Sequence, residues 1–370
     1  MTNRKPDYWL LTSTILLILI GAMMVYSASA IFALEKYHDP FYFFKKEILF
    51  CTLGFLLLFI TQRVDYHRYW KLVYPLMFIT AFFCILVAIP GIGVKVGGAR
   101  RWISVLGFTF QPSEMVKIAL ILFMAYSLTK KREKMENFSI GVLPHIIVAG
   151  GMMALIVLQK DLGTVVTLAF VMMVLLYVGG TKVSYLAGAI LLFLIAFVIL
   201  IMVEPYRMMR FLAYLDPWKH LADTGFQVIQ SFMGFNQGGI WGAGLGQGRQ
   251  KLFYLPAAHT DFILSVVGEE LGLFGVLTIL ALFAILIIRG FRASICAPDL
   301  FGTYLALGIT ALFVVQSFIN FGVVMGLLPT KGLPLPFISY GGTSILVMSV
   351  CVGVLLNVSS QAGTGLSGKG

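Results

Sequence analysis

The chain has 370 residues, of which 59% are hydrophobic and only 12% are charged, and its formal net charge is +11. A soluble domain is usually about 45–50% apolar and about 25% charged, so this composition excludes a soluble globular enzyme, a disordered chain and a coiled coil. The positive charge does not indicate nucleic-acid binding, because the basic residues lie in short clusters between long apolar runs. The composition therefore predicts a polytopic helical membrane protein.

Uncharged runs of about 20 residues are long enough to cross a bilayer as helices. The sequence contains about ten of them, of which the second and fourth are the weakest candidates, and it predicts an all-α, polytopic membrane protein. Residues 1–358 are expected to form a single ten-helix domain, and the tail 359–370 is expected to be disordered. The predicted transmembrane helices cover residues 9–32, 47–62, 72–90, 113–129, 141–158, 163–180, 184–203, 262–288, 302–327 and 338–358.

The distribution of Lys and Arg predicts the orientation of these helices. With both termini in the cytoplasm, the inner loops are denser in basic residues than the outer ones, as the positive-inside rule requires. The clearest inner cluster is formed by Lys130, Lys131, Arg132 and Lys134. We therefore expect both termini to be cytoplasmic.

This orientation puts three polar segments on the outer face: residues 91–112, the turn 159–161 and the large loop 204–260 between the seventh and eighth helices. The large loop is too apolar to be a linker, so we expect amphipathic pieces that lie on the membrane surface. Its GAGLGQG run at 242–248 resembles a dinucleotide-binding motif only superficially, because no βαβ context surrounds it. We interpret that run as a tight surface loop.

Charged residues inside a membrane are costly and are therefore candidates for function. Glu114 and Lys117 are three residues apart near the start of the fourth helix, so they share one helical face. They could form a neutralising packing pair, a functional pair, or both. For Glu269 and Glu270, inside the eighth helix, a structural role is the better hypothesis, and Glu47 is expected to be interfacial.

Asp261 lies where the eighth helix is expected to begin, at the outer face. A carboxylate at a helix N-terminus is stabilised by the helix dipole, so Asp261 could simply be an N-cap. Alternatively, it is a general base at the membrane surface. His259, two residues earlier, could also be a base, although a hydrogen-bonding role is commoner for such a histidine.

Outward-facing cations accompany this acid. Arg100, Arg101 and Trp102 form a pair of cations beside an aromatic ring, which suits a phosphate headgroup but also a simple interfacial anchor. Asp161 is a second outward acid near a helix start. Arg207 and Arg210 in the large loop are further outward cations.

Taken together, these residues resemble a known family. The segments that carry the resemblance occur in one order along nearly the whole chain: GARRW at 98–102, QPSE at 111–114 with Lys117, DLGT at 161–164, HTDFI at 259–263, EELG at 269–272 and PFISYGG at 336–342. This set resembles the SEDS (shape, elongation, division and sporulation) family of bacteria. The segments MVYSASA at 24–30, QGRQKLFYLP at 247–256 and KGLPLP at 331–336 look more like its division members, and elongation and sporulation roles are the alternatives.

The resemblance implies a peptidoglycan glycosyltransferase that polymerises lipid II at the outer face of the bacterial cytoplasmic membrane, at the division septum. It implies a class B penicillin-binding protein, a transpeptidase, as partner, together with other divisome proteins. It places the catalytic aspartate at Asp261. Substrate-binding roles fall on Arg101 and Trp102, and by extension on Arg100, Glu114, Lys117, Asp161 and His259. One departure is Lys160, which stands where relatives often carry Pro.

This chemistry fits the residues. A carboxylate at the external surface can accept the proton of the attacking sugar hydroxyl, and a single carboxylate without a covalent partner predicts inversion at the anomeric carbon. The pyrophosphate leaving group needs Arg, Lys or a divalent cation, Mg²⁺ or Mn²⁺, and no organic cofactor is expected.

Two other classes compete with an enzyme. A lipid II flippase would suit a bundle with buried polar residues, but the polar set lies at the outer face and no inverted repeat is evident. A non-catalytic scaffold that recruits the transpeptidase is the second alternative.

Overall fold

The computed structural model describes residues 6–96, 98–105, 107–220, 224–251, 258–330 and 332–362. Residues 252–257 of the QGRQKLFYLP segment, Lys331 and residues 363–370 of the predicted tail lie outside these ranges.

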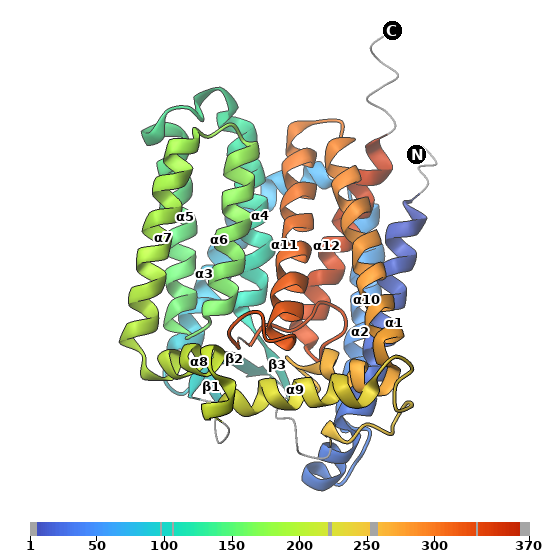
Figure 1. The fold of residues 1–370 in the computed structure, drawn as a ribbon. Helices are drawn as coiled ribbons and strands as arrows, with labels where there is room; N and C mark the ends of the chain where they lie inside the picture. The colour runs from blue at the N-terminus through green and yellow to red at the C-terminus, as the bar shows by residue number, and fades with distance from the viewer. Residues whose placement is uncertain are drawn as a thin grey trace.

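Within the described ranges, ten helices run along the bundle, and they match the ten predicted spans in order (Figure 1). Their bounds are α1 Tyr8–Tyr37, α2 Tyr42–Arg63, α3 Val73–Ala88, α4 Pro112–Lys131, α5 Leu143–Leu158, α6 Leu162–Val178, α7 Val183–Val203, α10 Ile263–Ile295, α11 Leu300–Val324 and α12 Gly342–Gln361. A short 3₁₀ helix, η1 Tyr66–Leu72, leads into α3. The last helix ends at Gln361, a little beyond the predicted domain boundary at residue 358.

Eight helices of the described chain are long and apolar enough to span a membrane. The helices α3 and α5 reach this length together with the short helical turns before them, as Tyr66–Ala88 and Phe138–Leu158. The other two helices fall short: α6 has only 17 residues, and α2 carries Lys45, Lys46 and Glu47 near its start and Arg63 at its end. Of the eight, α4 has the lowest mean hydropathy, 1.2. The second and fourth spans are therefore the most polar ones, as the sequence predicted.

Burial and hydropathy run in opposite directions in this bundle. The most apolar span, α7, has a hydropathy of 3.2 but only 6% of it is buried, whereas 83% of the least apolar span, α4, is buried. A helix that faces lipid must be apolar all round, while a central helix can hide polar groups against its neighbours. The bundle therefore has α4, α11 and α12 at its centre and α7 at its edge.

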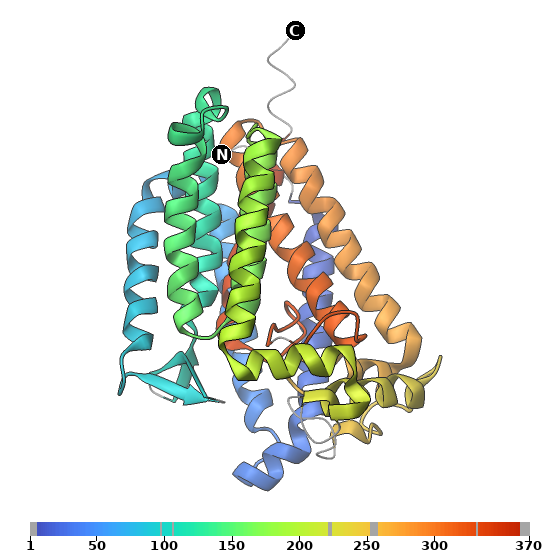
Figure 2. The same ribbon diagram turned by 60° about the vertical axis from the view of Figure 1, so that its left-hand side comes forward.

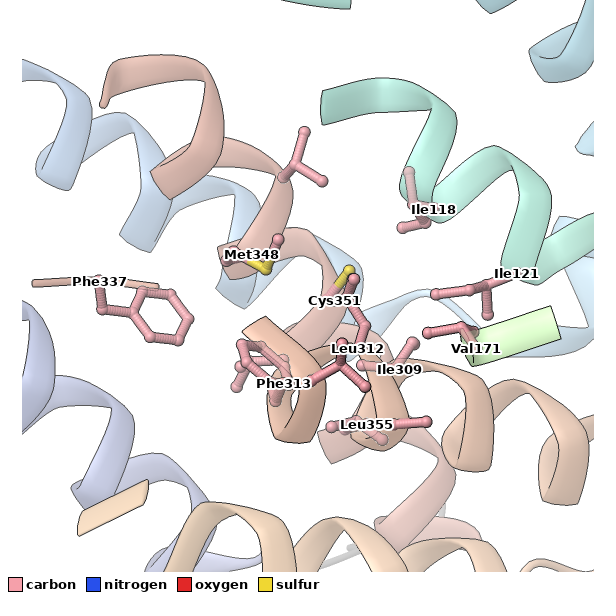
Figure 3. Packing of buried hydrophobic residues seen from close by; sticks show 14 of the residues in the cluster. Ile118, Ile121, Val171, Ile309, Leu312, Phe313, Phe337, Met348, Cys351 and Leu355 are labelled. Carbon is pink, nitrogen blue, oxygen red and sulfur yellow. The ribbon is translucent and has the colours of Figure 1, made fainter. Parts of the chain in front are cut away.

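The central helices pack through interdigitated aliphatic and aromatic side chains. Figure 3 shows residues of α4, α6, α11 and α12 meeting in one cluster, to which Phe337 contributes from the segment after α11. Phe313 stacks on Phe337 with a centroid distance of 5.7 Å. This contact ties the segment between α11 and α12 to the core.

All the extramembrane structure of the outer segments gathers at one end of the bundle, opposite the start of α1 and the end of α12 (Figures 1 and 2). Two surface helices, α8 Pro205–Leu215 and α9 Thr224–Gly238, run across that end, followed by the Gly-rich loop. As predicted, residues 204–260 contain surface helices, of which α8 is clearly amphipathic, and their position on the membrane surface stays a prediction.

A small β-sheet at the same end was not predicted. Residues 91–112 were expected to be a loop, but they contain the antiparallel strands β1 Gly93–Val96, β2 Ala99–Val105 and β3 Phe108–Phe110, in the order β1-β2-β3. Gly98 and Gly107 have φ angles of 79° and 82° in the two tight turns, where glycine carries no steric penalty. These glycines were the sequence signal for a hairpin that the loop assignment overlooked.

The eighth predicted span is a single uninterrupted run in the sequence, but the helix that it forms, α10, is kinked. Gly272 in α10 has φ 65° and ψ −162°, so the helix is kinked there. Backbone N–H groups of the Gly-rich loop occupy the carbonyls freed by the kink, with Ala243 N donating to Glu269 O at 2.8 Å and Gly244 N to Glu270 O at 3.0 Å. The kink thus provides the place where the large outer loop attaches.

A reporter fusion tests the orientation that the basic residues predict. Alkaline phosphatase fused after Gly370 should be inactive and a fluorescent protein there should be bright, because the loops on that side are rich in Lys and Arg. A phosphatase fusion truncated after Pro217, at the other end, should be active. The reverse pattern would invert the topology.

Candidate functional site

The end of the bundle that carries the sheet and the surface helices encloses a cavity of about 600 Å³. Its walls come from β2, the turn before α6, the end of α7 and the surface helices α8 and α9. The segment before α10 and the segment after α11 complete the lining. The lining is apolar on the α7 side, from Phe197 and Ile201, and carries charges of both signs elsewhere. The charged side chains that line it are Arg101, Lys160, Asp161, Glu204, Arg207, Arg210 and Asp261.

Asp261 is the carboxylate at the centre of this set. It lies in the turn before α10, whose N-cap residue is Phe262 and which has no side-chain capping bond. Asp261 is therefore not the N-cap that one hypothesis proposed. Among the described residues, no hydrogen bond to its carboxylate is seen, so both oxygens are available to a ligand.

Burial raises the pKa of Asp261 to about 6, while the guanidinium groups of Arg210 and Arg101 oppose this shift and the carboxylate of Asp161 adds to it. The expected stabilisation by the helix dipole is thus outweighed by desolvation. A carboxylate with this pKa is mostly ionised at pH 7 yet basic enough to accept a proton.

Arg101 and Arg210 line the cavity from two different elements, β2 and α8. Backbone carbonyls hold both side chains in place. Arg101 in β2 donates from Nε to Gln159 O at 3.2 Å and from Nη2 to Lys160 O at 2.6 Å. Arg210 in α8 donates from Nη1 to Thr330 O at 3.3 Å and lies over the ring of Tyr206. Its buried Nε has no partner among the described residues, so this cation has donor capacity left for a ligand.

Asp161 contributes to the cavity wall but is committed to its own helix. It is the N-cap of α6, and its carboxylate accepts from Thr164 N at 3.2 Å and from Thr164 Oγ1 at 2.9 Å. Ser113 Oγ donates to the same carboxylate at 3.3 Å. Asp161 therefore ties the starts of α4 and α6 together beside the cavity.

The turn before Asp161 differs from the one that a proline would allow. Lys160 has φ 60°, whereas the proline ring fixes φ near −65°. Its ammonium group reaches across to Glu204 at the end of α7, at 3.1 Å. Lys160 in this chain thus joins the α5–α6 turn to the poorly packed α7 at the cavity wall.

Glu114 and Lys117 lie outside the cavity lining. They form an ion pair with an Nζ–Oε1 distance of 2.6 Å inside α4, and both side chains are almost completely buried. Glu114 Oε2 has no partner among the described residues. The structure favours the neutralising packing pair over direct contact with a ligand.

His259 and Arg100 are also away from the cavity. His259 lies among aromatic rings, 4.9 Å from the centroid of Phe43 and 5.9 Å from that of Tyr340, and burial lowers its pKa to about 4. Arg100 is opposite Lys95 on the β1–β2 ladder and does not line the cavity. Trp102, by contrast, does line it.

Several lining residues were not among the predicted site residues. Arg207 and Arg210 were seen only as outward cations, although their i,i+3 spacing puts both on one face of α8. Glu204 and Gln227 gave no recognisable signal, because their place depends on how α8 and α9 fold back over the bundle.

The glutamates of the EELG segment have the structural role that was the better hypothesis. Glu269 accepts from Arg249 N at 2.6 Å, while Glu270 accepts from Ser27 Oγ, from Gly246 N at 3.1 Å and from Lys251 Nζ at 2.8 Å. These bonds fasten the Gly-rich loop to α10 and α1. The loop is therefore a closed surface turn, as expected.

Glu47 corrects one expectation. It was expected at the interface, but α2 begins at Tyr42, five residues before the predicted start at 47, so Glu47 lies inside the helix and is fully buried.

The donors present do not fit a resident divalent cation. Such sites need several oxygen ligands, and no group of three His, Cys, Asp or Glu side chains in the described ranges could hold a metal. The Asp161 carboxylate already accepts a hydrogen bond from Thr164, and Glu204 forms an ion pair with Lys160. The positive charge in the cavity comes from arginine and lysine, and the Mg²⁺ or Mn²⁺ requirement stays a prediction.

Comparison with known proteins identifies the class. Residues 8–364 match the family described as "Cell cycle protein", the group of FtsW, RodA and SpoVE, and the chain belongs to this family. A "probable peptidoglycan glycosyltransferase FtsW" of Geobacter metallireducens is 48% identical over 96% of this chain and 95% of its own length. "Stage V sporulation protein E" of Bacillus subtilis is 43% identical over 97% of this chain and 99% of its own.

The fold has a close counterpart among solved structures. One chain, from work on "polymerization and crosslinking by a peptidoglycan synthase complex", aligns with a TM-score of 0.79 and 27% identity, covering 97% of this chain and 99% of that one. The multi-pass bundle of ten helices is therefore the fold of this family.

The ion pair in α4 gives a test of its role. Lys117→Met should leave Glu114 as an uncompensated buried charge and cost about 3–5 kcal/mol of stability. The double variant Glu114→Gln/Lys117→Met should recover both the thermal melting temperature in detergent and activity. A stable double variant without activity would show instead that the pair takes part in function.

Proposed function

We propose that this protein is a peptidoglycan glycosyltransferase that polymerises lipid II at the outer face of the cytoplasmic membrane. The observation that carries the proposal is the uncommitted carboxylate of Asp261, in a cavity it shares with Arg101 and Arg210. This arrangement supplies a base and positive charge for a leaving group in one enclosed space. The names of the relatives support the reaction class.

In the proposed reaction, the acceptor sugar hydroxyl attacks the anomeric carbon of the donor and gives its proton to Asp261. A glycosidic C–O bond forms, and the bond between the anomeric carbon and the lipid pyrophosphate breaks. Arg101 and Arg210 neutralise the charge that develops on the departing pyrophosphate. Since Asp261 acts as a base and not as a nucleophile, the configuration at the anomeric carbon is inverted.

The surroundings of the cavity suit a lipid-linked substrate. Phe197 and Ile201 of α7 form an apolar wall, and only 6% of the α7 span is buried inside the bundle. A polyprenyl chain can therefore remain in the bilayer while its pyrophosphate reaches the arginines. The cavity lies at one end of the bundle and not at the midplane, which favours an enzyme over a flippase.

The partner and cellular role are part of the proposal. The similar solved chain comes from a peptidoglycan synthase complex, which supports a class B penicillin-binding protein as partner. The naming of relatives as FtsW supports a role in division, with other divisome proteins at the septum of the inner membrane, and the SpoVE relative keeps sporulation as the alternative.

Asp261→Asn tests the base directly. The substitution keeps the shape of the side chain but removes its ability to accept a proton, so lipid II polymerisation by the purified protein should fall by about 10²–10⁴-fold. Folding and binding to the transpeptidase should persist, because the carboxylate makes no capping bond. Polymerisation near the wild-type rate would refute the assignment, and a wild-type protein that moves lipid II without polymerising it would indicate a flippase.

The rate should also depend on pH through the same group. Because the ionised form of Asp261 is the active one and burial raises its pKa to about 6, the initial rate should be constant above neutral pH and decline as pH falls through about 6. Initial rates in detergent between pH 5 and 8 measure this limb. A flat profile down to pH 5 would contradict a base with a raised pKa.

A further inference from the structure

Asn320 is a buried amide next to the proposed site. It lies in the last turn of α11, and only 2% of it is exposed. Its Nδ2 donates two hydrogen bonds of 2.9 Å each, one to the backbone carbonyl of Asp261 and one to that of Leu333. Since both acceptors are carbonyl oxygens, the amide nitrogen must face them.

These two carbonyls belong to different segments that meet beside the Asp261 carboxylate. Asp261 lies in the turn before α10, and Leu333 lies in the segment between α11 and α12. Gly332, next to Leu333, comes so close to Asp261 that a Cβ there would be 3.3 Å from Oδ2, and 3.7 Å from Nη1 of Arg101. The segment held by Asn320 thus lies next to both the carboxylate and one of its cations.

Leu333 connects the same segment to the opposite wall of the cavity. It is buried, and its Cγ would lie 2.7 Å from a Cβ placed on Gly163, directly after the Asp161 turn. The Asn320 amide therefore fixes the distance between the Asp261 backbone and the 332–333 segment. That segment lies close to both Arg101 and the start of α6.

We infer that Asn320 is a positioning residue for the reaction, which holds the backbone of Asp261 and the 332–333 segment at the spacing that aims the carboxylate at the acceptor hydroxyl. This inference rests on the proposed function of Asp261. Asn320 does not line the cavity, so it acts on the base and not on the substrate.

Asn320→Leu, which keeps the branched shape and the number of heavy atoms but removes both hydrogen bonds, tests the inference. A displacement of about 1 Å at a reacting group can cost on the order of 10²-fold in rate, so kcat for lipid II polymerisation should fall about 10- to 100-fold while KM changes less than about threefold. The control is Gln316→Met, one turn earlier on the same helix, where the buried amide has no partner among the described residues. That variant should retain wild-type kcat.

The pH profile separates positioning from a merely structural effect. The charged groups that act on Asp261 are Arg210 of α8, Arg101 of β2 and Asp161 at the start of α6. If Asn320→Leu lets Asp261 move away from the two arginines, the acid limb of kcat should shift to higher pH. Lower yield alone would leave the limb and the rate per folded molecule unchanged.

Gly332→Ala provides a second variant in case Asn320→Leu does not fold. The added methyl group presses on the Asp261 carboxylate from the segment that Asn320 holds, so kcat should fall. Because Gly332 also lines the cavity, kcat and not KM is the readout for this variant. Wild-type kcat in either folded variant, or an equal loss in Gln316→Met, would overturn the inference. If Asp261→Asn is inactive in the same assay, only the role of Asn320 fails; if Asp261→Asn is active, the proposed function fails first.

Discussion

One desolvated carboxylate and the arginines around it balance each other's charge in the cavity. Asp261 is buried enough for its pKa to rise to about 6, and Arg210 and Arg101 keep it from rising further. Without the arginines the pKa of the carboxylate would be higher, and less of it would be ionised at neutral pH to act as a base. Without burial it would be a weaker base, and the cavity would not exclude water from the developing charge.

The membrane explains why this balance is built at the end of the bundle. Inside the bundle, Glu114 and Lys117 near the outer start of α4 are almost completely buried as an ion pair, which lowers the cost of burying each charge. At the outer end, carbonyls at the ends of helices and strands hold the guanidinium groups, as Gln159 and Lys160 hold Arg101. The central helices can carry polar residues because they do not face lipid, whereas α7 is apolar because it does.

The sequence predicted the elements that depend on local chemistry. The ten spans follow from hydropathy alone, and Asp261 could be singled out because an acid stood at the mouth of an apolar run. Arg101 was likewise visible as a cation in an outer loop. The resemblance to the SEDS family supplied the order of the motifs, and the comparisons support that family assignment.

The parts that were missed depend on contacts between distant segments. Glu47 turned out to be buried because the structure extends α2 beyond the uncharged run. His259, expected near the substrate, is enclosed by Phe43 and Tyr340 from other elements. Arg210 lies near Asp261 only because α8 folds back over the bundle. No residue spacing in the sequence predicts that arrangement.

The most direct test of the account is the anomeric configuration of the bond that the purified protein forms from lipid II. A single base that activates the acceptor hydroxyl for direct displacement requires inversion relative to the donor, and nuclear magnetic resonance of the glycan product reports this configuration. Direct displacement gives complete inversion and leaves no sugar attached to the protein in rapidly quenched samples. Retention of configuration, or a glycosyl ester on Asp261 found by mass spectrometry, would contradict it.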